Sequence, residues 1–250
     1  ARTLAEDELE EAALVMTELL GSWTARSELG PAELAELERH RDLLDRITAR
    51  LLFNPGNPWR SYTHKVEPGQ NLSSICDYYI TRKKVLVRPG FVAAVNRLPS
   101  MDRIHRDQLL RIPSGTLKAV VEKKSHTLKL FFDEVLVRVY RVGLGKKGSE
   151  TPEGTFVVID RLHEPVWFDR SSGKVYPYGH PENPLGDHYI KLKHLQTGRT
   201  DYAIHGTRKA DRDTIGTDAS RGCIRMYAED VRELYRFLPK DDPRTGVPEG

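Results

Sequence analysis

The sequence predicts a multidomain α+β chain that consists of a helical hairpin, a small βααβ module and a mostly-β domain. Three observations support this fold class. Apolar residues recur at helical spacing through the first fifty positions, strand-like and helix-like patterns alternate over residues 62–113, and strand-forming residues dominate from position 117 onward. With 38% apolar and 30% charged residues among 250, the composition is typical of a soluble globular protein rather than a disordered or membrane-spanning one.

The helical hairpin is expected over residues 1–53. Residues 3–20 are expected to form the first helix, which Gly21 ends. Its apolar side chains share one face: Leu9, Ala12, Ala13, Met16, Leu19 and Leu20. The second helix is expected to begin at Gly30-Pro31, because proline fits the first turn of a helix. The hairpin is either a packing element or a partner-binding surface, and the first use is the commoner one.

The small module is expected over residues 60–114, after a boundary rich in turn-forming residues between Phe53 and Pro58. A strand ends at the Pro68-Gly69 turn, and a helix starts at Asn71 or Ser73. A second helix covers residues 91–96 and a last strand covers residues 109–112. The predicted order is therefore strand, helix, helix, strand.

The mostly-β domain is expected over residues 116–240, with a polar tail at 241–250. Strands are predicted at residues 118–122, 127–132, 135–142, 188–192 and 202–204, and a helix at 229–237. Residues 160–186 are rich in proline, glycine and aromatic side chains. We expect an irregular segment there that forms a lid or packs onto the sheet.

The strongest chemical signal lies in residues 202–226, which hold one histidine and one of the two cysteines. The short apolar run before His205 indicates a buried strand, so this histidine comes where that strand ends. Gly222 directly precedes Cys223, and its backbone freedom would allow a tight turn that presents the thiol at a surface. A nucleophile would occupy such a position.

A thiol reacts as its thiolate, whose formation a nearby cation, a histidine or a helix N-terminus favours. Arg221 and Arg225 flank Cys223, and a predicted helix begins a few residues later, so a lowered thiol pKa is expected. His205 would act as the base, and backbone N–H groups near Gly222 would stabilise an oxyanion. The alternative is a buried, inert cysteine and a hydrogen-bonded loop histidine.

Residues 202–226 resemble the active-site signature of the YkuD family of L,D-transpeptidases, in which an HG pair precedes an S-H-G-C-hydrophobic-R segment. The matching residues are His205, Gly206, Ser220, Gly222, Cys223, Ile224 and Arg225. Arg221 replaces the family's usual histidine, and arginine cannot act as a base. The segment from Thr151 to Phe156 resembles a second family feature, so the resemblance covers residues 117–238.

The resemblance implies a peptidoglycan L,D-transpeptidase without a cofactor, in which Cys223 attacks a tetrapeptide stem donor and His205 transfers protons. An amine acceptor would form cross-links or attachments, and acylation by carbapenem-type β-lactams is implied as well. Two alternatives stay open. Water as acceptor would make the chain an L,D-carboxypeptidase, and a decayed site would leave a non-catalytic wall-binding protein.

Further site residues are expected around this pair. Those that shape the site are Gly206, Ser220, Gly222, Arg221 and Arg225; weaker substrate-binding or site candidates are Tyr189, Tyr202, Trp167, His188 and His194. We also expect the charge of Arg221 to keep Cys223 as thiolate, so that Arg221→Ala raises the pH at which the thiol is alkylated.

The small module resembles LysM, a domain that binds glycans containing N-acetylglucosamine. The resemblance rests on Tyr62, Val66, Pro68, Gly69, Leu72, Ile75, Asn96, Leu109, Ile112 and Pro113. It departs from the family in the basic segment 82–88 and in Asp107, which replaces the usual glycine. Peptidoglycan glycan strands are therefore an expected partner, and a structural brace is the alternative.

The net charge of +3 is small and dispersed, so no nucleic-acid partner is expected. No CxxC or HExxH spacing predicts a metal site. Cys76 and Cys223 fall in different predicted domains, so two free thiols are expected, with Cys76 in a core. The chain begins with alanine and shows no secretory signal. We therefore expect that a targeting segment or membrane anchor has been removed, and the family resemblance implies an extracytoplasmic protein of the periplasm or cell wall.

Overall fold

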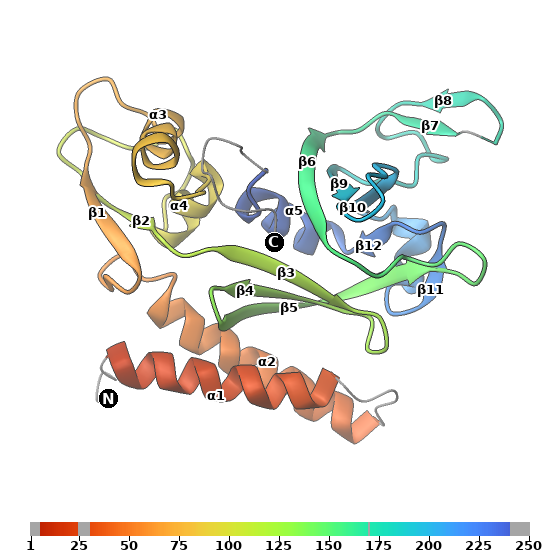
Figure 1. Ribbon diagram of the computed structural model, residues 1–250, viewed down its shortest axis with the longest axis horizontal. Helices are drawn as coiled ribbons and strands as arrows, with labels where there is room; N and C mark the ends of the chain where they lie inside the picture. The colour runs from red at the N-terminus through yellow and green to blue at the C-terminus, as the bar shows by residue number, and fades with distance from the viewer. Residues whose placement is uncertain (1–5, 25–30, 170, 241–250) are drawn as a thin grey trace. The chain divides into compact units, whose positions relative to one another are not determined.

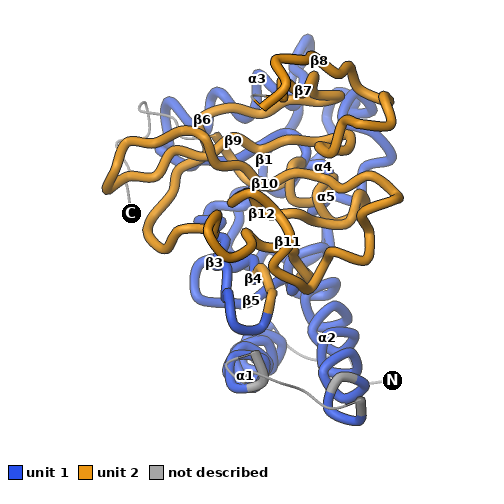
Figure 2. Tube along the Cα trace, turned by 90° about the vertical axis from the view of Figure 1, so that its right-hand side faces the viewer, with its two compact units in different colours: residues 1–125, 129–139, 242–247 blue, residues 126–128, 140–241, 248–250 orange. Residues whose placement is uncertain are grey.

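The computed structural model describes residues 6–24, 31–169 and 171–240 (Figure 1). These residues divide into two compact units, shown in different colours in Figure 2. The first unit contains the described residues up to 125 together with 129–139. The second contains 126–128 and the described residues from 140 to 240. Within the described part of the chain, no helix combines the length and hydropathy that a bilayer-spanning segment needs.

Two long helices open the first unit, α1 (Glu6–Thr24) and α2 (Pro31–Leu51), and they pack against each other. Their apolar faces are buried as the periodicity predicts: Leu9, Ala13, Met16 and Leu20 in α1, and Leu37, Leu44, Ile47 and Leu51 in α2. The start of α2 at proline is confirmed. The expected stop at Gly21 is wrong, because α1 continues through it to Thr24. A single glycine costs a helix only about 1 kcal/mol, which tertiary packing readily offsets.

The predicted strand, helix, helix, strand order of the small module is confirmed. Its elements are β1 (Ser61–Lys65), α3 (Leu72–Tyr78), η1 (Tyr79–Lys83), α4 (Pro89–Val95) and β2 (Leu109–Pro113). The two strands pair antiparallel, with Ser61 opposite Pro113. Asn71 caps α3 by accepting from the Ser74 N–H, as expected for a helix that starts there. Cys76 is a free, buried thiol in α3.

Most strands of the chain form an eight-stranded sheet with the order β3-β4-β5-β12-β10-β9-β6, and β11 pairs with β5. Their bounds are β3 (Leu117–Glu122), β4 (Thr127–Phe132), β5 (Val135–Gly145), β6 (Phe156–His163), β9 (His188–His194), β10 (Tyr202–His205), β11 (Asp218–Ser220) and β12 (Ile224–Met226). The predicted mostly-β character of this part of the chain is confirmed.

The centre of the second unit is strand β10, which pairs antiparallel with β9 and parallel with β12. A parallel pair needs a crossover connection. Here residues 206–223 provide it, and they include the short 3-10 helix η2 (Lys209–Thr214), which the sequence pattern did not predict. Helix α5 (Ala228–Phe237) follows β12 and packs on β9, burying Val231, Leu234 and Phe237. The predicted tail at 241–250 lies outside the described residues.

Residues 160–186 are more regular than expected. Strand β6 continues to His163, and β7 (Trp167–Asp169) pairs with β8 (Lys174–Tyr176) as a short hairpin. The Trp167 and Tyr176 rings stack at 5.4 Å. The Asn183 side-chain amide donates to backbone carbonyls on both sides of the hairpin, those of Pro165 and Tyr176. Such side-chain hydrogen bonds were not visible in the pattern of residue types.

Candidate active site

The pairing register places the cysteine and the histidine on one face of the sheet. Ile204 is opposite Ile224 and His205 is opposite Arg225 in the parallel pair β10–β12. Side chains alternate between the faces of a strand, and Cys223 directly precedes β12, so continuing this alternation places it on the face of His205. Both faces of β10 are buried, because Ile204 is 4% exposed and His205 is 3% exposed. The two strands, which residues 206–223 connect, therefore direct the thiol and the imidazole to the same face of the sheet.

His205 is a neutral imidazole in this site. It is 3% exposed, and its Nδ1 lies 2.6 Å from the Gly206 carbonyl oxygen. The pKa of His205 is lowered to about 4: burial is the largest cause and the charge of Arg225 acts in the same direction, while backbone hydrogen bonds to Gly206 and Leu185 oppose the shift. Because a carbonyl oxygen only accepts, Nδ1 carries the proton, and the lone pair is on Nε2. The ring has the protonation state that a base requires.

Cys223 is half-buried and free of any disulfide. Burial raises the pKa of its thiol above the usual value; a backbone hydrogen bond to Ala203 and the charge of Arg225 act in the opposite direction. The expected lowered thiol pKa is therefore wrong for the resting state, because desolvation outweighs the nearby cation. The resting site therefore holds a neutral thiol and a neutral imidazole rather than a thiolate and an imidazolium.

Ser220 fixes the loop that carries the thiol. Its hydroxyl is buried, donates to the Cys223 carbonyl oxygen at 2.6 Å and accepts from the Gly222 N–H at 3.1 Å. The expected site-shaping role of Ser220 thus has a physical basis. The same contact changes the oxyanion expectation, because the Gly222 N–H is already engaged by Ser220. Of the backbone N–H groups expected to stabilise an oxyanion near Gly222, that of Cys223 is therefore the candidate.

Gly222 occupies a backbone conformation that side chains disfavour, with φ of +109°. A methyl group there would be only in ordinary contact, with the Ser149 carbonyl oxygen at 3.6 Å. The cost of Gly222→Ala is thus backbone strain, of order 1–3 kcal/mol of unfolding free energy. We also expect slower alkylation of Cys223, because relief of the strain displaces the Ser220 hydrogen bonds.

The matched control is Gly198→Ala. Gly198 also has a positive φ, +70°, and open space around its Cα, but it lies in a turn away from the thiol loop. Thermal unfolding and the rate of iodoacetamide labelling would be measured for both variants. A loss of stability in both variants, with slowed labelling only in Gly222→Ala, is expected; unchanged labelling in both would contradict the role of the loop.

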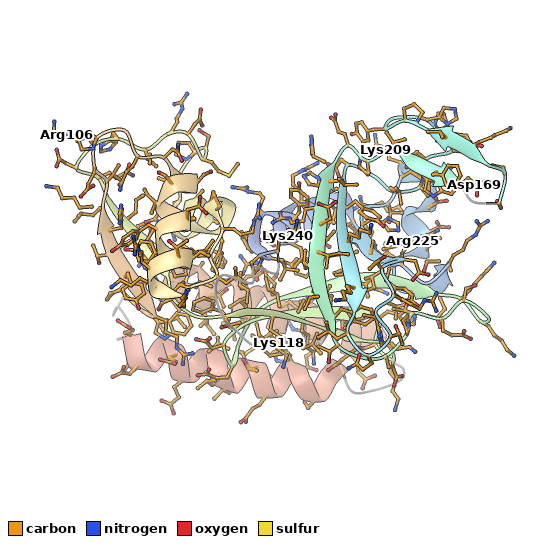
Figure 3. The ribbon with its side chains drawn as sticks, turned by 45° about the horizontal axis from the view of Figure 1, so that its top comes forward. Arg106, Lys118, Asp169, Lys209, Arg225 and Lys240 are labelled. Carbon is orange, nitrogen blue, oxygen red and sulfur yellow. The ribbon has the colours of Figure 1, made fainter. Side chains whose placement is uncertain are left out.

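The two arginines differ from what their positions in the sequence suggested. Arg225 (Figure 3) is the cation that acts on both Cys223 and His205, and its Nη1 donates to the Thr214 hydroxyl at 3.2 Å. Arg221 is 73% exposed and extends toward Asp169, at 3.9 Å. Its expected effect on the thiol is therefore wrong as first stated, since its charge is directed to solvent and to Asp169.

The weaker candidates Tyr189, His188 and His194 all belong to β9, but they lie on its two opposite faces. The Tyr189 ring stacks on His205 at 6.2 Å and so lies on the site face of β9. His188 packs on Tyr235 of α5 at 4.6 Å, and His194 alternates with it on the same buried face, so these two are structural. His194 also has both ring nitrogens engaged, by the Glu153 carbonyl and by Thr197.

Two aromatic candidates lie in different surroundings. The Tyr202 ring borders the loop of residues 220–223 that carries the thiol. A Cβ added to Gly222 would be 3.8 Å from Cε1 of Tyr202. Trp167 belongs to the β7–β8 hairpin, whose Asp169 (Figure 3) faces Arg221.

Sequence reasoning missed two residues that shape this site. Asp201 directly precedes β10 and its charge raises the pKa of Cys223. Gly186 has a φ of +67° and lies against the backbone of Gly206. A Cβ added to Gly186 would be only 2.9 Å from the Cα and the carbonyl carbon of Gly206. Asp201 could have been found from the sequence, because side chains alternate along a strand and Asp201 lies four residues before His205. The close approach of Gly186 to Gly206 had no signal in the sequence other than the glycine itself.

Comparison with known proteins identifies the family of the chain. Residues 117–245 match the family model YkuD, an L,D-transpeptidase catalytic domain. The YkuD protein of Bacillus licheniformis is 30% identical over 184 residues, which cover 70% of this chain and 93% of that protein. The YqjB protein of Bacillus subtilis is 32% identical over 125 residues, or 50% of this chain and 68% of that protein.

A solved L,D-transpeptidase from Mycobacterium smegmatis aligns with a TM-score of 0.42 and 15% identity, over 73% of this chain and 89% of that one. Similarity at that level carries no inference by itself. The family model, however, matches more than half of this chain, and the Bacillus licheniformis protein is covered over nearly its whole length. The chain therefore belongs to the YkuD family of L,D-transpeptidases.

Proposed function

We propose that Cys223 is the nucleophile and His205 the general base of this L,D-transpeptidase. The observation that carries the proposal is their placement on one face of the β10–β12 pair as a neutral thiol and a neutral imidazole. A neutral base beside a neutral nucleophile can take up the proton as the attack occurs. Arg225, which acts on both groups, would stabilise the thiolate as it forms.

The first half-reaction forms a thioester. The Cys223 proton passes to His205 Nε2 as sulfur bonds to the carbonyl carbon of the residue before the terminal D-residue. The amide C–N bond then breaks, and His205 returns the proton to the leaving amine. The oxyanion formed between these steps would be held by backbone donors that include the Cys223 N–H, because Ser220 engages that of Gly222.

The second half-reaction transfers the acyl group. An amine from an acceptor stem attacks the thioester, a new amide bond forms and the carbon–sulfur bond breaks. The proton lost by the amine returns the sulfur to the thiol through His205. Ser220 contributes by holding the Cys223 carbonyl and thereby the direction of the side chain. Gly206, whose carbonyl accepts from His205 Nδ1, fixes the tautomer.

The small βααβ module is proposed to be a LysM-like glycan-binding domain over residues 60–114, preceded by the helical hairpin at 1–53 and followed by the catalytic domain at 116–240. Two of its tyrosines, Tyr62 and Tyr78, are 41% and 48% exposed and both contact the Tyr79 ring. Exposed aromatic rings suit sugar stacking. The alignment with the Bacillus licheniformis protein also covers more of the chain than residues 117–245. A structural brace remains the alternative for this module.

Family members act on peptidoglycan outside the cytoplasm, and peptidoglycan stem peptides are the substrates consistent with the family. A periplasmic or cell-wall location is proposed for this chain. An amine acceptor distinguishes the proposed transpeptidase from an L,D-carboxypeptidase that uses water.

The test is turnover of a tetrapeptide stem donor by the full chain, with and without an amine acceptor, followed by mass spectrometry of the products. We expect a new amide-linked product that requires the acceptor, with slow release of tripeptide in its absence. Equal tripeptide formation with and without acceptor would indicate the carboxypeptidase. No release of the D-residue under either condition would contradict catalysis and favour the wall-binding alternative.

A further inference from the structure

Asn183 is a buried polar residue that the proposed reaction does not use. Its side chain is 5% exposed, yet both sides of the amide are engaged. The Nδ2 group donates to the carbonyl oxygens of Pro165, Tyr176 and Pro177 at 3.0, 3.1 and 3.2 Å. The Oδ1 atom accepts from the N–H of Leu185 at 3.0 Å. One side chain therefore joins three segments of the second unit.

The donor side of the amide anchors Asn183 to the β7–β8 hairpin (Figure 1). Pro165 lies two residues before β7, and Tyr176 is the last residue of β8, so the amide binds both ends of the hairpin. The acceptor side makes a local turn, because an asparagine side chain that accepts from the N–H two residues later directs the backbone there. The anchored side chain thus sets the path of the chain at Leu185.

The turn set by Asn183 lies against the backbone of Gly206. A Cβ added to Gly206 would be 3.4 Å from both the Leu185 carbonyl oxygen and the Gly186 Cα. A Cβ added to Gly186 would be only 2.9 Å from the Cα and the carbonyl carbon of Gly206. The Gly206 N–H also donates to the His188 carbonyl oxygen at 3.0 Å. Residues 185–188 therefore fix Gly206 by close contact and by a hydrogen bond.

Gly206 in turn fixes the imidazole. Its carbonyl oxygen lies 2.6 Å from Nδ1 of His205, and this acceptor keeps the proton on Nδ1 and the lone pair on Nε2. A second backbone hydrogen bond to the ring comes from Leu185, the residue that Asn183 holds. A shift of residues 183–188 would move both groups. In acyl transfer, misplacement by about 1 Å can cost roughly 10²-fold in rate.

Most buried asparagines only satisfy the backbone of a loop. This one satisfies a loop that contacts the acceptor of the His205 proton. We propose that Asn183 is a positioning residue for the base: anchored on the β7–β8 hairpin, it holds residues 185–188 against Gly206 and so keeps the proton of His205 on Nδ1. This inference rests on the proposed role of His205 and deepens it by naming what maintains its tautomer.

The test compares Asn183→Ala with Asn96→Ala. Asn96 is the matched control, because it is a buried asparagine of the first unit. Its amide donates to the carbonyls of Val92 and Arg111 and accepts from the Arg111 N–H. Imidazole ¹⁵N NMR at pH 7, without substrate, distinguishes Nδ1–H from Nε2–H rings. The His205 signals are those missing from His205→Gln. Donor cleavage between pH 5 and 8 and thermal unfolding are measured on the same variants.

We expect wild-type His205 to show the Nδ1–H form alone and Asn183→Ala to show a mixture of the two tautomers. The value of kcat should fall by about 10- to 100-fold, because part of the population has its proton on the nitrogen that must accept one and the ring is less well placed. The remaining activity should rise with pH, since reaction through thiolate already present gains weight. Asn96→Ala should lose stability while its His205 signals and kcat stay those of wild type.

Asn183→Ser is the second variant, for the case that Asn183→Ala does not fold. Its hydroxyl can still accept from the Leu185 N–H, but it is too short to reach all three carbonyls, so the anchor is lost with a smaller cavity. We expect tautomer mixing in the same direction with a smaller amplitude.

Three results would overturn the inference. A folded Asn183 variant with the Nδ1–H form alone would leave Asn183 a purely stabilising role. Equal mixing in Asn96→Ala would show that any loss of stability releases the ring, and a mixture already present in wild type would show that the tautomer is not held. Absence of donor cleavage by wild type would instead count against the proposed function, because the tautomer is read without substrate.

Discussion

Cys223→Ala is expected to abolish acyl transfer, lowering the rate of donor cleavage by about 10⁴-fold or more, as removal of a nucleophile does in other acyl-transfer enzymes. It should also remove covalent labelling by a carbapenem, since no other group on the site face of β12 can form the thioester. Intact-protein mass spectrometry after incubation with a carbapenem measures both proteins side by side. Wild type should gain the mass of one inhibitor molecule.

Cys76→Ala is the matched control for this experiment. Cys76 is buried in α3 of the first unit, where burial raises the pKa of its thiol to about 12. The variant should therefore keep the adduct, with at most a loss of stability from the small cavity. An adduct that persists in Cys223→Ala and disappears in Cys76→Ala would refute the assignment of the nucleophile.

His205→Gln is expected to lower kcat by roughly 10² to 10⁴ at neutral pH, the range that general base catalysis contributes. The pH profile gives the sharper test. The pKa of His205 is about 4, so the wild-type imidazole is neutral at pH 7 and is protonated, and unable to accept a proton, only as the pH falls toward 4. Wild-type activity should thus be nearly flat between pH 5 and 8, because this range begins about one unit above the pKa of His205.

In His205→Gln the reaction must rely on thiolate already present. Because burial raises the pKa of Cys223, the thiolate fraction at neutral pH is small and grows about tenfold for each unit of pH. The activity of the variant should therefore rise with pH through this range, unlike that of wild type. His105→Gln, an exposed histidine of the first unit, is the control. Parallel profiles for His205→Gln and wild type would contradict the role of His205 as base.

Much of this site could be predicted because its parts are local in the sequence. Strand β10 and the turn before Cys223 are read from a short apolar run and a glycine, and the loop contact of Ser220 spans only three residues. The βααβ order followed from turn residues and caps, as the capping by Asn71 illustrates. In each case the residue type alone restricts the backbone.

The remainder depended on contacts between distant segments. That His188 faces α5 while Tyr189 faces His205 is fixed by strand register, which a single sequence does not specify. The direction of the thiol pKa also depends on burial, and the neighbouring arginines alone suggested the opposite sign. The β7–β8 hairpin was missed because its order comes from ring stacking and from Asn183 rather than from alternation.

The protonated state of the resting thiol has a consequence for the durability of the protein. Peroxide and other oxidants react with thiolates far faster than with thiols, and oxidation beyond the sulfenic acid is irreversible for most proteins. Burial raises the pKa of Cys223, so that its resting form is mainly the thiol, and Cys76 is buried as well. The nucleophile of such a chain should be lost to oxidants more slowly than one whose resting site holds a thiolate.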